Sequence, residues 1–243
     1  MLSEPERDDE LWALVPIKEL TRAKKRLEAC LGKHRPGLCM AMFRDVLNAL
    51  AQSRKIYHTV VVTADAEAAK MSESIAALHV EEVESIGMIS AIELGIDAIQ
   101  SMGGHNIVIL PADIPLLTGD EIDRLIESFA IERQRRGGKT VGISPSKDNK
   151  GTNLLYFSTD HQIPLRYGPD SYQLHRQAAS EQLIEPIPLH STAISLDIDE
   201  QMDLDEFIAY CAENPVCQQT ETWKFLQKRG YSHHAEAVKR MQQ

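Results

Sequence analysis

The first half of the chain alternates between short apolar runs and longer segments with helical spacing. The short runs are rich in Val, Ile and Leu, which predicts buried strands at residues 11–17, 58–63 and 106–110. Apolar residues recur every three or four positions in other segments, which predicts helices at residues 38–50, 86–102 and 121–133. Strands that alternate with helices are typical of a mostly parallel sheet covered on both faces. The pattern therefore predicts a three-layer α/β/α fold.

The second half is less regular but continues the same kind of domain. Residues 140–144 and 153–157 predict two strands around a polar loop, and a helix is expected from Ser171. The run ISLDI at residues 194–198 predicts a last strand, and helical spacing resumes at residues 201–211.

Charge separates the two ends of the chain from its centre. Residues 1–10 are acidic, and residues 220–243 carry five basic and two acidic side chains. We therefore expect one domain at residues 11–213, an acidic N-terminal segment at 1–10, and a basic, helical C-terminal tail at 214–243. We expect the tail helix to fold against the domain, outside the main sheet.

The composition of the whole chain narrows the classes of function. The net charge of −10 counts against generic nucleic-acid binding, which is typical of basic domains. No apolar run approaches the roughly 18 residues of a membrane span, and the acidic N-terminus is unlike a signal peptide. The four cysteines lack the spacing of a metal site, so we expect reduced thiols in a cytoplasmic protein.

A cluster of cations directly follows the first predicted strand. Residues 18–35 hold seven Lys or Arg against two acids, including Lys18, Lys24 and Arg26. Lys binds phosphate as a point charge and Arg binds it as a planar fork, so this loop could neutralise a polyphosphate. A solvated helix face explains such a run equally well.

Asp113 follows the strand predicted at residues 106–110 and lies between Pro111 and Pro115. Proline restricts its own backbone and the residue before it, so the carboxylate is held in a stiff loop. In an open parallel sheet, ligands bind at the carboxyl ends of the strands. We favour an Mg²⁺ ligand over a helix cap, because Thr118 and Asp120 are better placed to cap.

Two further acids, Asp197 and Asp199, are separated by one residue. On a strand they would face the same side and could share a cation, although the wet face of an edge strand has the same pattern.

Small and hydroxylic residues form the last candidate group, at Thr152, Gly168 and Ser171. Backbone N–H groups near glycine and hydroxyls at a helix start can bind an anion, although ordinary turns have the same composition. His175 is interpreted as a core or helix-cap histidine and not as a base.

Taken in order, these elements resemble the 2-phospholactate guanylyltransferase family of coenzyme F420 biosynthesis. The resemblance covers residues 11–210 and implies a GT-A-like, Rossmann-related nucleotidyltransferase fold. Its motifs are V-P-x-K-x-x-x-x-A-K-x-R-L, P-A-D-x-P-L, G-T-N, F-G-x-x-S-x-x-x-H and L-D-x-D-T-P-x-D-L. The matching segments here are VPIKELTRAKKRL, LPADIPLL, GTN, YGPDSYQLH and LDIDEQMDL.

The resemblance implies that the phosphate of a three-carbon acid attacks the α-phosphorus of GTP, which releases pyrophosphate and forms a diphosphate-linked guanosine adduct. The partners it implies are GTP, Mg²⁺ and a phosphorylated carboxylic acid, without nucleic acid or membrane. The residues it implies are catalytic Lys18, Lys24, Arg26 and Asp113; nucleotide-binding Pro16, Lys18, Lys24, Gly87 and Ser90; acceptor-binding Thr152, Gly168 and Ser171; and metal-binding Asp113, Asp197 and Asp199.

Two positions depart from the family pattern. Ile89 replaces the Asn of a G-L-N-x-A element, and Glu200-Gln201 replaces the Thr-Pro of the late motif. The choice among phosphoenolpyruvate, 3-phospho-D-glycerate and 2-phospho-L-lactate as the acceptor therefore stays open. The nucleobase of the nucleotide substrate stays open as well. A homodimer also stays open.

Two alternatives remain for the function. One is a molybdopterin or sugar-phosphate nucleotidyltransferase, although such enzymes open with a Gly-rich loop that VPIKEL does not provide. The other is a non-catalytic nucleotide-binding protein, which would be expected to lack the metal-binding aspartates that this chain has at positions 113, 197 and 199.

Overall fold

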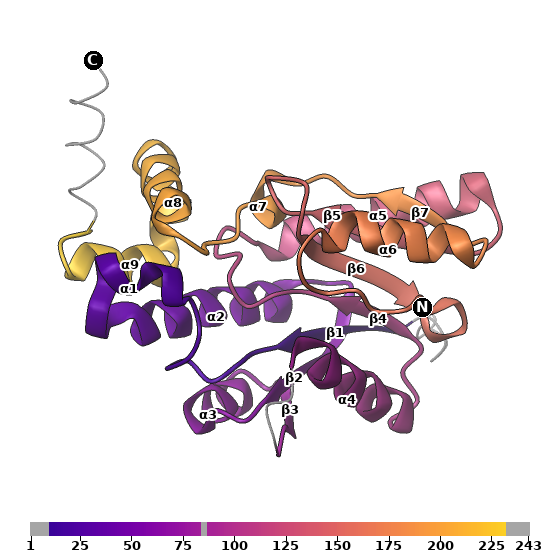
Figure 1. Ribbon diagram of the computed structural model, residues 1–243, viewed down its shortest axis with the longest axis horizontal. Helices are drawn as coiled ribbons and strands as arrows, with labels where there is room; N and C mark the ends of the chain where they lie inside the picture. Colours follow the sequence, from indigo (N-terminus) through magenta and orange to yellow (C-terminus); the bar gives the residue numbers. More distant parts are fainter. Residues whose placement is uncertain (1–9, 84–86, 232–243) are drawn as a thin grey trace, which may run out of the picture.

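A computed structural model describes residues 10–83 and 87–231, and within them seven strands form one sheet (Figure 1). The strand order is β3-β2-β1-β4-β6-β5-β7, and only β6 runs antiparallel to its neighbours. This confirms the mostly parallel sheet. The bounds are β1 (Leu11–Pro16), β2 (Ile56–Thr63), β3 (Leu78–Glu81), β4 (Asn106–Ile109), β5 (Thr140–Pro145), β6 (Thr152–Ser158) and β7 (Glu185–Pro188).

Helices cover both faces of the sheet, as the alternation of elements predicts. Leu11, Ala13 and Val15 of β1 join one apolar cluster, and Trp12 and Leu14 join the other, because successive strand residues point to opposite faces. The first cluster includes α2 (Arg35–Gln52), α3 (Ala66–Ser74) and α5 (Gly119–Arg136); the second includes α4 (Met88–Ser101) and α6 (Ser171–Glu181). The three-layer architecture is therefore confirmed. Short helical segments lie at η2 (Lys25–Leu27), α1 (Glu28–Leu31), η3 (Gly32–His34) and η4 (Thr159–His161).

One glycine sets how closely α4 approaches the sheet. A Cβ on Gly95 would lie 2.3 Å from Leu14 Cδ1 and 2.9 Å from Val62 Cγ2. A larger residue would therefore push α4 away from β1 and β2, the strands that it contacts.

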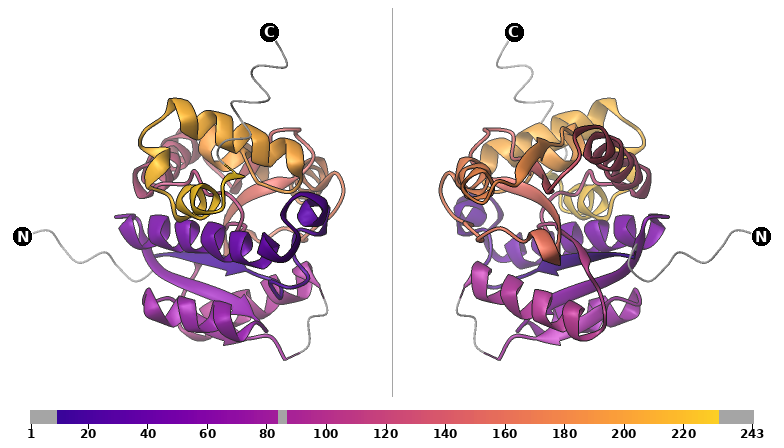
Figure 2. Two further views of the ribbon diagram at one scale, coloured as in Figure 1. Left: turned by 90° about the vertical axis from the view of Figure 1, so that its left-hand side faces the viewer. Right: turned by 90° about the vertical axis from the view of Figure 1, so that its right-hand side faces the viewer.

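The C-terminal part contains α8 (Gln201–Glu213), η5 (Cys217–Gln219) and α9 (Glu221–Lys228). Figure 2 shows α9 lying on α2, away from the sheet. The Asp45 carboxylate of α2 accepts the N–H groups of Glu221 and Thr222 at 2.7 and 2.9 Å, and Leu226 is buried. Within the described part of the tail, α9 is a helix that packs against α2. Residues 1–9 and 232–243 lie outside the described residues, and the division of the chain into an N-terminal segment, a domain ending at Glu213 and a tail stays a prediction.

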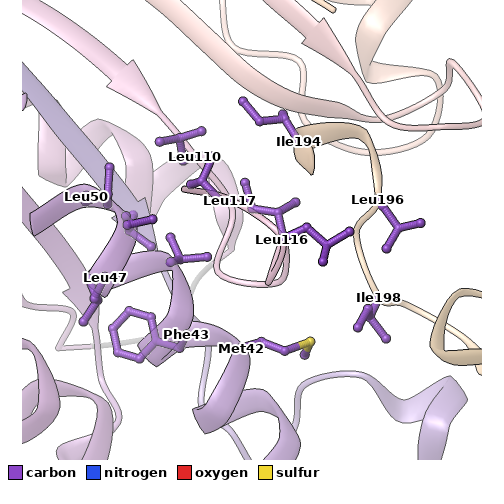
Figure 3. Packing of buried hydrophobic residues seen from close by; sticks show 14 of the residues in the cluster. Met42, Phe43, Leu47, Leu50, Leu110, Leu116, Leu117, Ile194, Leu196 and Ile198 are labelled. Atoms are coloured by element: carbon purple, nitrogen blue, oxygen red, sulfur yellow. The ribbon is translucent and has the colours of Figure 1, made fainter. Parts of the chain in front are cut away.

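The strand predicted at residues 194–198 is wrong. The segment forms the short helix α7 (Thr192–Ser195) and then an irregular stretch outside the sheet. Its apolar side chains Ile194, Leu196 and Ile198 are buried instead, and they belong to the same core cluster as Leu116 and Met42 (Figure 3). The alternation of apolar and acidic residues in this segment therefore reflects core packing and not strand pairing.

Two strands lack a clear signal in the sequence, and both lie at the edges of the sheet. The segments LHVE of β3 and EPIP of β7 each have four residues and few apolar positions. The helix predicted at residues 86–102 begins at Met88, and Ile86 lies outside the described residues. None of the helices within the described residues has both the length and the apolar character needed to cross a membrane.

Candidate active site

The candidate site lies where the strand order changes direction. The chain passes from β1 to β2 and β3 on one side, then returns to β4 on the other side of β1. Adjacent loops that leave β1 and β4 toward opposite sides open a crevice, which is the usual ligand site of such sheets. The basic loop follows β1, and Asp113 follows β4.

Lys24 links the two sides of this crevice. Its ammonium group forms ion pairs with the carboxylates of Asp113 and Asp199, and its side chain is 11% exposed. Burial opposes the charge, but the attraction of Asp113 and Asp199 is stronger and holds the pKa of Lys24 above its usual range. Lys24 therefore stays protonated at neutral pH.

The backbone of Lys24 is also unusual, with φ 51° and ψ 44° in the left-handed region. Residues other than glycine adopt this conformation at a cost of about 1 kcal/mol, and such residues often occur at functional sites. Lys24 borders one cavity of the site, and Arg26, two residues later in the chain, borders another.

Asp197 completes an acidic cluster around Lys24. Burial, followed by repulsion from Asp113, raises the pKa of Asp197 to about 6. The amide of Asn153 donates 2.9 Å hydrogen bonds both to Asp197 Oδ1 and to the carbonyl of Ile194. Asn153 therefore positions this acid, a role that the sequence analysis did not assign although it quoted the GTN motif.

Two cavities open on the cluster, and Asp199 lines both. The first has a volume of about 290 Å³ and the second about 930 Å³. The first is bordered by Pro16, Lys18, Lys24 and Asp113 among the predicted residues, and the second by Arg26, Gly168 and Asp197.

The carboxylates suit a hard divalent cation. Asp113 Oδ1 is buried and has no hydrogen-bond partner within the described residues. The three acids around Lys24 leave an excess of negative charge, and Mg²⁺ is commonly held by one or two carboxylates together with substrate phosphates. No three His, Cys, Asp or Glu side chains of the described residues already converge as a metal cluster. The acids therefore fit Mg²⁺ as ligands that act together with a bound phosphate.

Arg35 holds the backbone of the basic loop, residues 18–26, in place. This role was not predicted from the sequence. This buried side chain donates to the backbone carbonyls of Leu20, Thr21 and Ala23 and pairs with Glu28. Because the guanidinium has five donors in a fixed plane, it can satisfy several carbonyls of one turn together. The only sequence signal was the excess of cations in residues 18–35, which does not separate structural from binding residues.

Thr152 and Ser171 come together on the other side of the site. The Ser171 hydroxyl donates to Thr152 Oγ1 at 3.2 Å, and Thr152 Oγ1 lies 3.0 Å from His175 Nδ1. All three residues are buried, and their neighbours Gly151 and Asp170 line the larger cavity. Burial, with the charge of Arg166, lowers the pKa of His175 to about 4. His175 is therefore a neutral core histidine, as predicted.

Gly87 and Ser90 lie at the start of α4. Gly87 precedes the helix with φ +149°, a backbone conformation that favours glycine. Neither residue borders the first cavity, which Met88 does. Their predicted contact with nucleotide stays a prediction.

Comparison with known proteins identifies the family. The family model described as "Guanylyl transferase CofC like" matches residues 11–242. The chain belongs to this family. It is accordingly a nucleotidyltransferase that transfers a guanylyl group, and the match extends into the tail, beyond the motifs found in the sequence.

Individual relatives agree with the family assignment. The chain is 29% identical over 195 residues to phosphoenolpyruvate guanylyltransferase from Conexibacter woesei, covering 80% of this chain and 85% of that protein. It is also 29% identical over 199 residues to 2-phospho-L-lactate guanylyltransferase from Methanothermobacter thermautotrophicus, covering 82% and 84%. A crystal structure of a candidate nucleotide-diphospho-sugar transferase from Desulfovibrio desulfuricans is similar in fold, with TM-score 0.71, 17% identity and coverage of 93% and 98%.

Proposed function

We propose that the protein is a cytoplasmic enzyme of coenzyme F420 biosynthesis that joins GTP to a phosphorylated three-carbon acid. The acceptor is phosphoenolpyruvate, 3-phospho-D-glycerate or 2-phospho-L-lactate. The observation that carries the proposal is the pair of cavities that share Asp199 at the crevice, one beside the basic loop and one beside the hydroxyl pair. The names of the relatives support the substrate class, and the four free thiols agree with a reducing compartment.

In this reaction a phosphate oxygen of the acid attacks the α-phosphorus of GTP. A new P–O bond forms, the bond between the α- and β-phosphates breaks, and pyrophosphate leaves with the electron pair. The acceptor supplies the nucleophile, so the protein needs no nucleophilic side chain. Its contribution is to align the two substrates and to neutralise charge that develops on the phosphates.

The basic loop and the acids have separate tasks in this scheme. Lys18 and Lys24 border the smaller cavity and would bind the triphosphate of GTP, while Arg26 borders the larger one and would face the acceptor. Thr152, Gly168 and Ser171 would bind the phosphate and carboxylate of the acid. Asp113, with Asp197 or Asp199, would hold Mg²⁺, which when bound supplies positive charge to the reacting phosphates.

The test is pyrophosphate release by the whole protein with Mg²⁺, with GTP or ATP, and with each acid in turn. We expect release with GTP and one acid, which defines the base and the acceptor together. Pyrophosphate release with ATP and an acid, but not with GTP and the same acid, would overturn the choice of GTP.

The alternatives predict different results in the same assay. Pyrophosphate release with GTP and a sugar phosphate or molybdopterin, but with none of the acids, would support another type of nucleotidyltransferase. No turnover with any of the acids, while GTP with magnesium still raises the melting temperature, would point to a different acceptor, because a ligand stabilises the form that binds it. No turnover and no thermal stabilisation by GTP would support the non-catalytic protein.

A further inference from the structure

A chain of hydrogen bonds with a fixed direction ends at the predicted acceptor site. Arg166 N–H donates to His175 Nε2 at 2.8 Å. A backbone N–H can only donate, so Nε2 must present its lone pair. The buried ring is neutral at pH 7, and a neutral imidazole carries one proton, so that proton is on Nδ1.

The proton on Nδ1 determines what the two hydroxyls can do. Nδ1–H donates to Thr152 Oγ1, 3.0 Å away, and Ser171 Oγ lies 3.2 Å from the same oxygen. The two hydroxyls have two hydrogens, of which one lies between them. Whichever hydroxyl donates in that bond, the other keeps a free hydrogen, because no other partner for either group occurs among the described residues.

The opposite tautomer would have the opposite effect. If Nδ1 presented a lone pair, Thr152 would donate to Nδ1 and Ser171 would donate to Thr152. Both hydrogens would then be used inside the protein, and the pair would offer only lone pairs to a ligand. That arrangement would repel an anion, whereas the arrangement with the proton on Nδ1, which the Arg166 N–H requires, would bind one.

The place of the pair in the fold fits a ligand-binding role. Gly151 and Asp170, the neighbours of Thr152 and Ser171 in the chain, both line the larger cavity. Ser171 is the first residue of α6, and the positive end of the helix dipole there also favours an anion, although the N–H groups of Ser171 and Tyr172 already donate to the carbonyls of Gly168 and Lys150. The ring of Tyr167 packs edge-on against His175 with a centroid distance of 4.8 Å, which restricts rotation of the imidazole.

We infer that His175 is a positioning residue that turns the Thr152–Ser171 pair into a hydrogen-bond donor for the phosphate or carboxylate of the acceptor acid. The inference rests on the proposed function for the identity of that acid. His175 itself does not touch the substrate and transfers no proton.

Two variants separate the two nitrogen atoms of the ring. His175→Asn places an amide near Nδ1 and keeps a donor for Thr152, whereas His175→Gln places an amide near Nε2 and keeps an acceptor for Arg166 N–H. We expect His175→Gln to raise the KM for the acid about tenfold, with the KM for GTP within about twofold of wild type. His175→Asn should recover most of the acceptor affinity.

A double variant tests whether His175 acts through Thr152. If it does, Thr152→Val in the His175→Gln background adds little to the increase in KM for the acid, because both changes remove the same donor. Melting temperatures measured in parallel separate these effects from unfolding. Equal increases in the KM of both substrates in folded His175→Gln, or an unchanged KM for the acid, would overturn the inference.

Nitrogen-15 chemical shifts of the histidines in the wild-type protein give a result that does not depend on turnover. We expect the Nδ1–H tautomer for His175, assigned by its loss in His175→Gln. An active wild-type enzyme whose His175 carries the proton on Nε2 would overturn this inference alone. A wild-type protein that turns over none of the three acids would overturn the proposed function and, with it, the role of His175.

Discussion

The two sides of the candidate site would bind anionic substrates in different ways. On the side of β1 and β4, charge faces charge, with Lys24 held between Asp113 and Asp199. On the side of β6 and α6, Thr152, Ser171 and His175 form a neutral network. Charged pairs in a half-buried site are strong but costly to desolvate, whereas a neutral network acts through the direction of its donors. The charged side suits a triphosphate with a cation, and the neutral side suits a small acid that must be oriented.

The two sides also differ in what keeps them rigid. Residues 17–24 after β1 form neither a helix nor a strand, and Arg35 supplies hydrogen-bond donors for their carbonyls. Thr152 and Ser171 instead begin a strand and a helix, whose backbone bonds hold them. The loop side should therefore be the more sensitive to a single substitution.

The largest expected effect is on the charged side. Asp113→Asn removes one partner of Lys24 and the buried Oδ1 charge, and we expect pyrophosphate release to fall about a thousandfold or more while the fold is kept. Asp120→Asn is the control, because that side chain is 91% exposed on α5. Wild-type activity of Asp113→Asn would contradict the assignment of Asp113 to the metal.

Arg35→Lys tests whether the planar guanidinium of Arg35, and not only its charge, holds the loop after β1 in place. A lysine cannot reach three carbonyls together, so we expect the free energy of unfolding to fall by about 2–4 kcal/mol. Urea unfolding measures the loss, and Lys33→Ala at an exposed neighbouring position serves as the control. Unchanged stability would show that the loop holds its shape without Arg35.

The pH dependence of stability tests the neutral side. Burial lowers the pKa of His175 from its usual value of 6.5 to about 4. Between pH 4 and pH 6.5 the histidine is protonated in the unfolded chain and neutral in the folded chain. The free energy of unfolding that His175 contributes is therefore retained above pH 6.5 and falls as the pH drops toward 4. We expect this histidine to account for about 2 kcal/mol of loss between pH 7 and pH 5.

Urea unfolding at both pH values, compared with His175→Asn, isolates that contribution from the acid groups. The variant should lose less stability than the wild type over the same interval. Equal losses of stability in the two proteins would show that burial does not lower the pKa of His175 in the folded protein.

The smallest expected effect is a selective one. Ser171→Ala removes one hydroxyl of the pair, and we expect about a tenfold higher KM for the acid with little change in the KM for GTP. Steady-state pyrophosphate release with each substrate varied in turn measures the split. Equal weakening of both substrates would place Ser171 elsewhere in the site.

The central part of the fold could be predicted from sequence because its signals are local. A strand such as β1, buried along all six residues, needs apolar side chains at every position, and that run is visible without any structure. The stiff loop around Asp113 is equally local, since the prolines that restrict it are its neighbours. Edge strands β3 and β7 could not be found, because their short and mixed sequences form strands only beside a neighbour.

The sequence by itself determined the order of strands and helices and the residue types around the crevice. The tertiary structure decided which of them act together. Lys24 and Asp199 are 175 positions apart, and only the fold makes them an ion pair. It likewise turned residues 194–198 from an expected strand into a core segment, and it made Arg35 a support for the loop. The physical reason is that side-chain patterns report each element's own burial, whereas contacts between elements depend on packing that no local pattern contains.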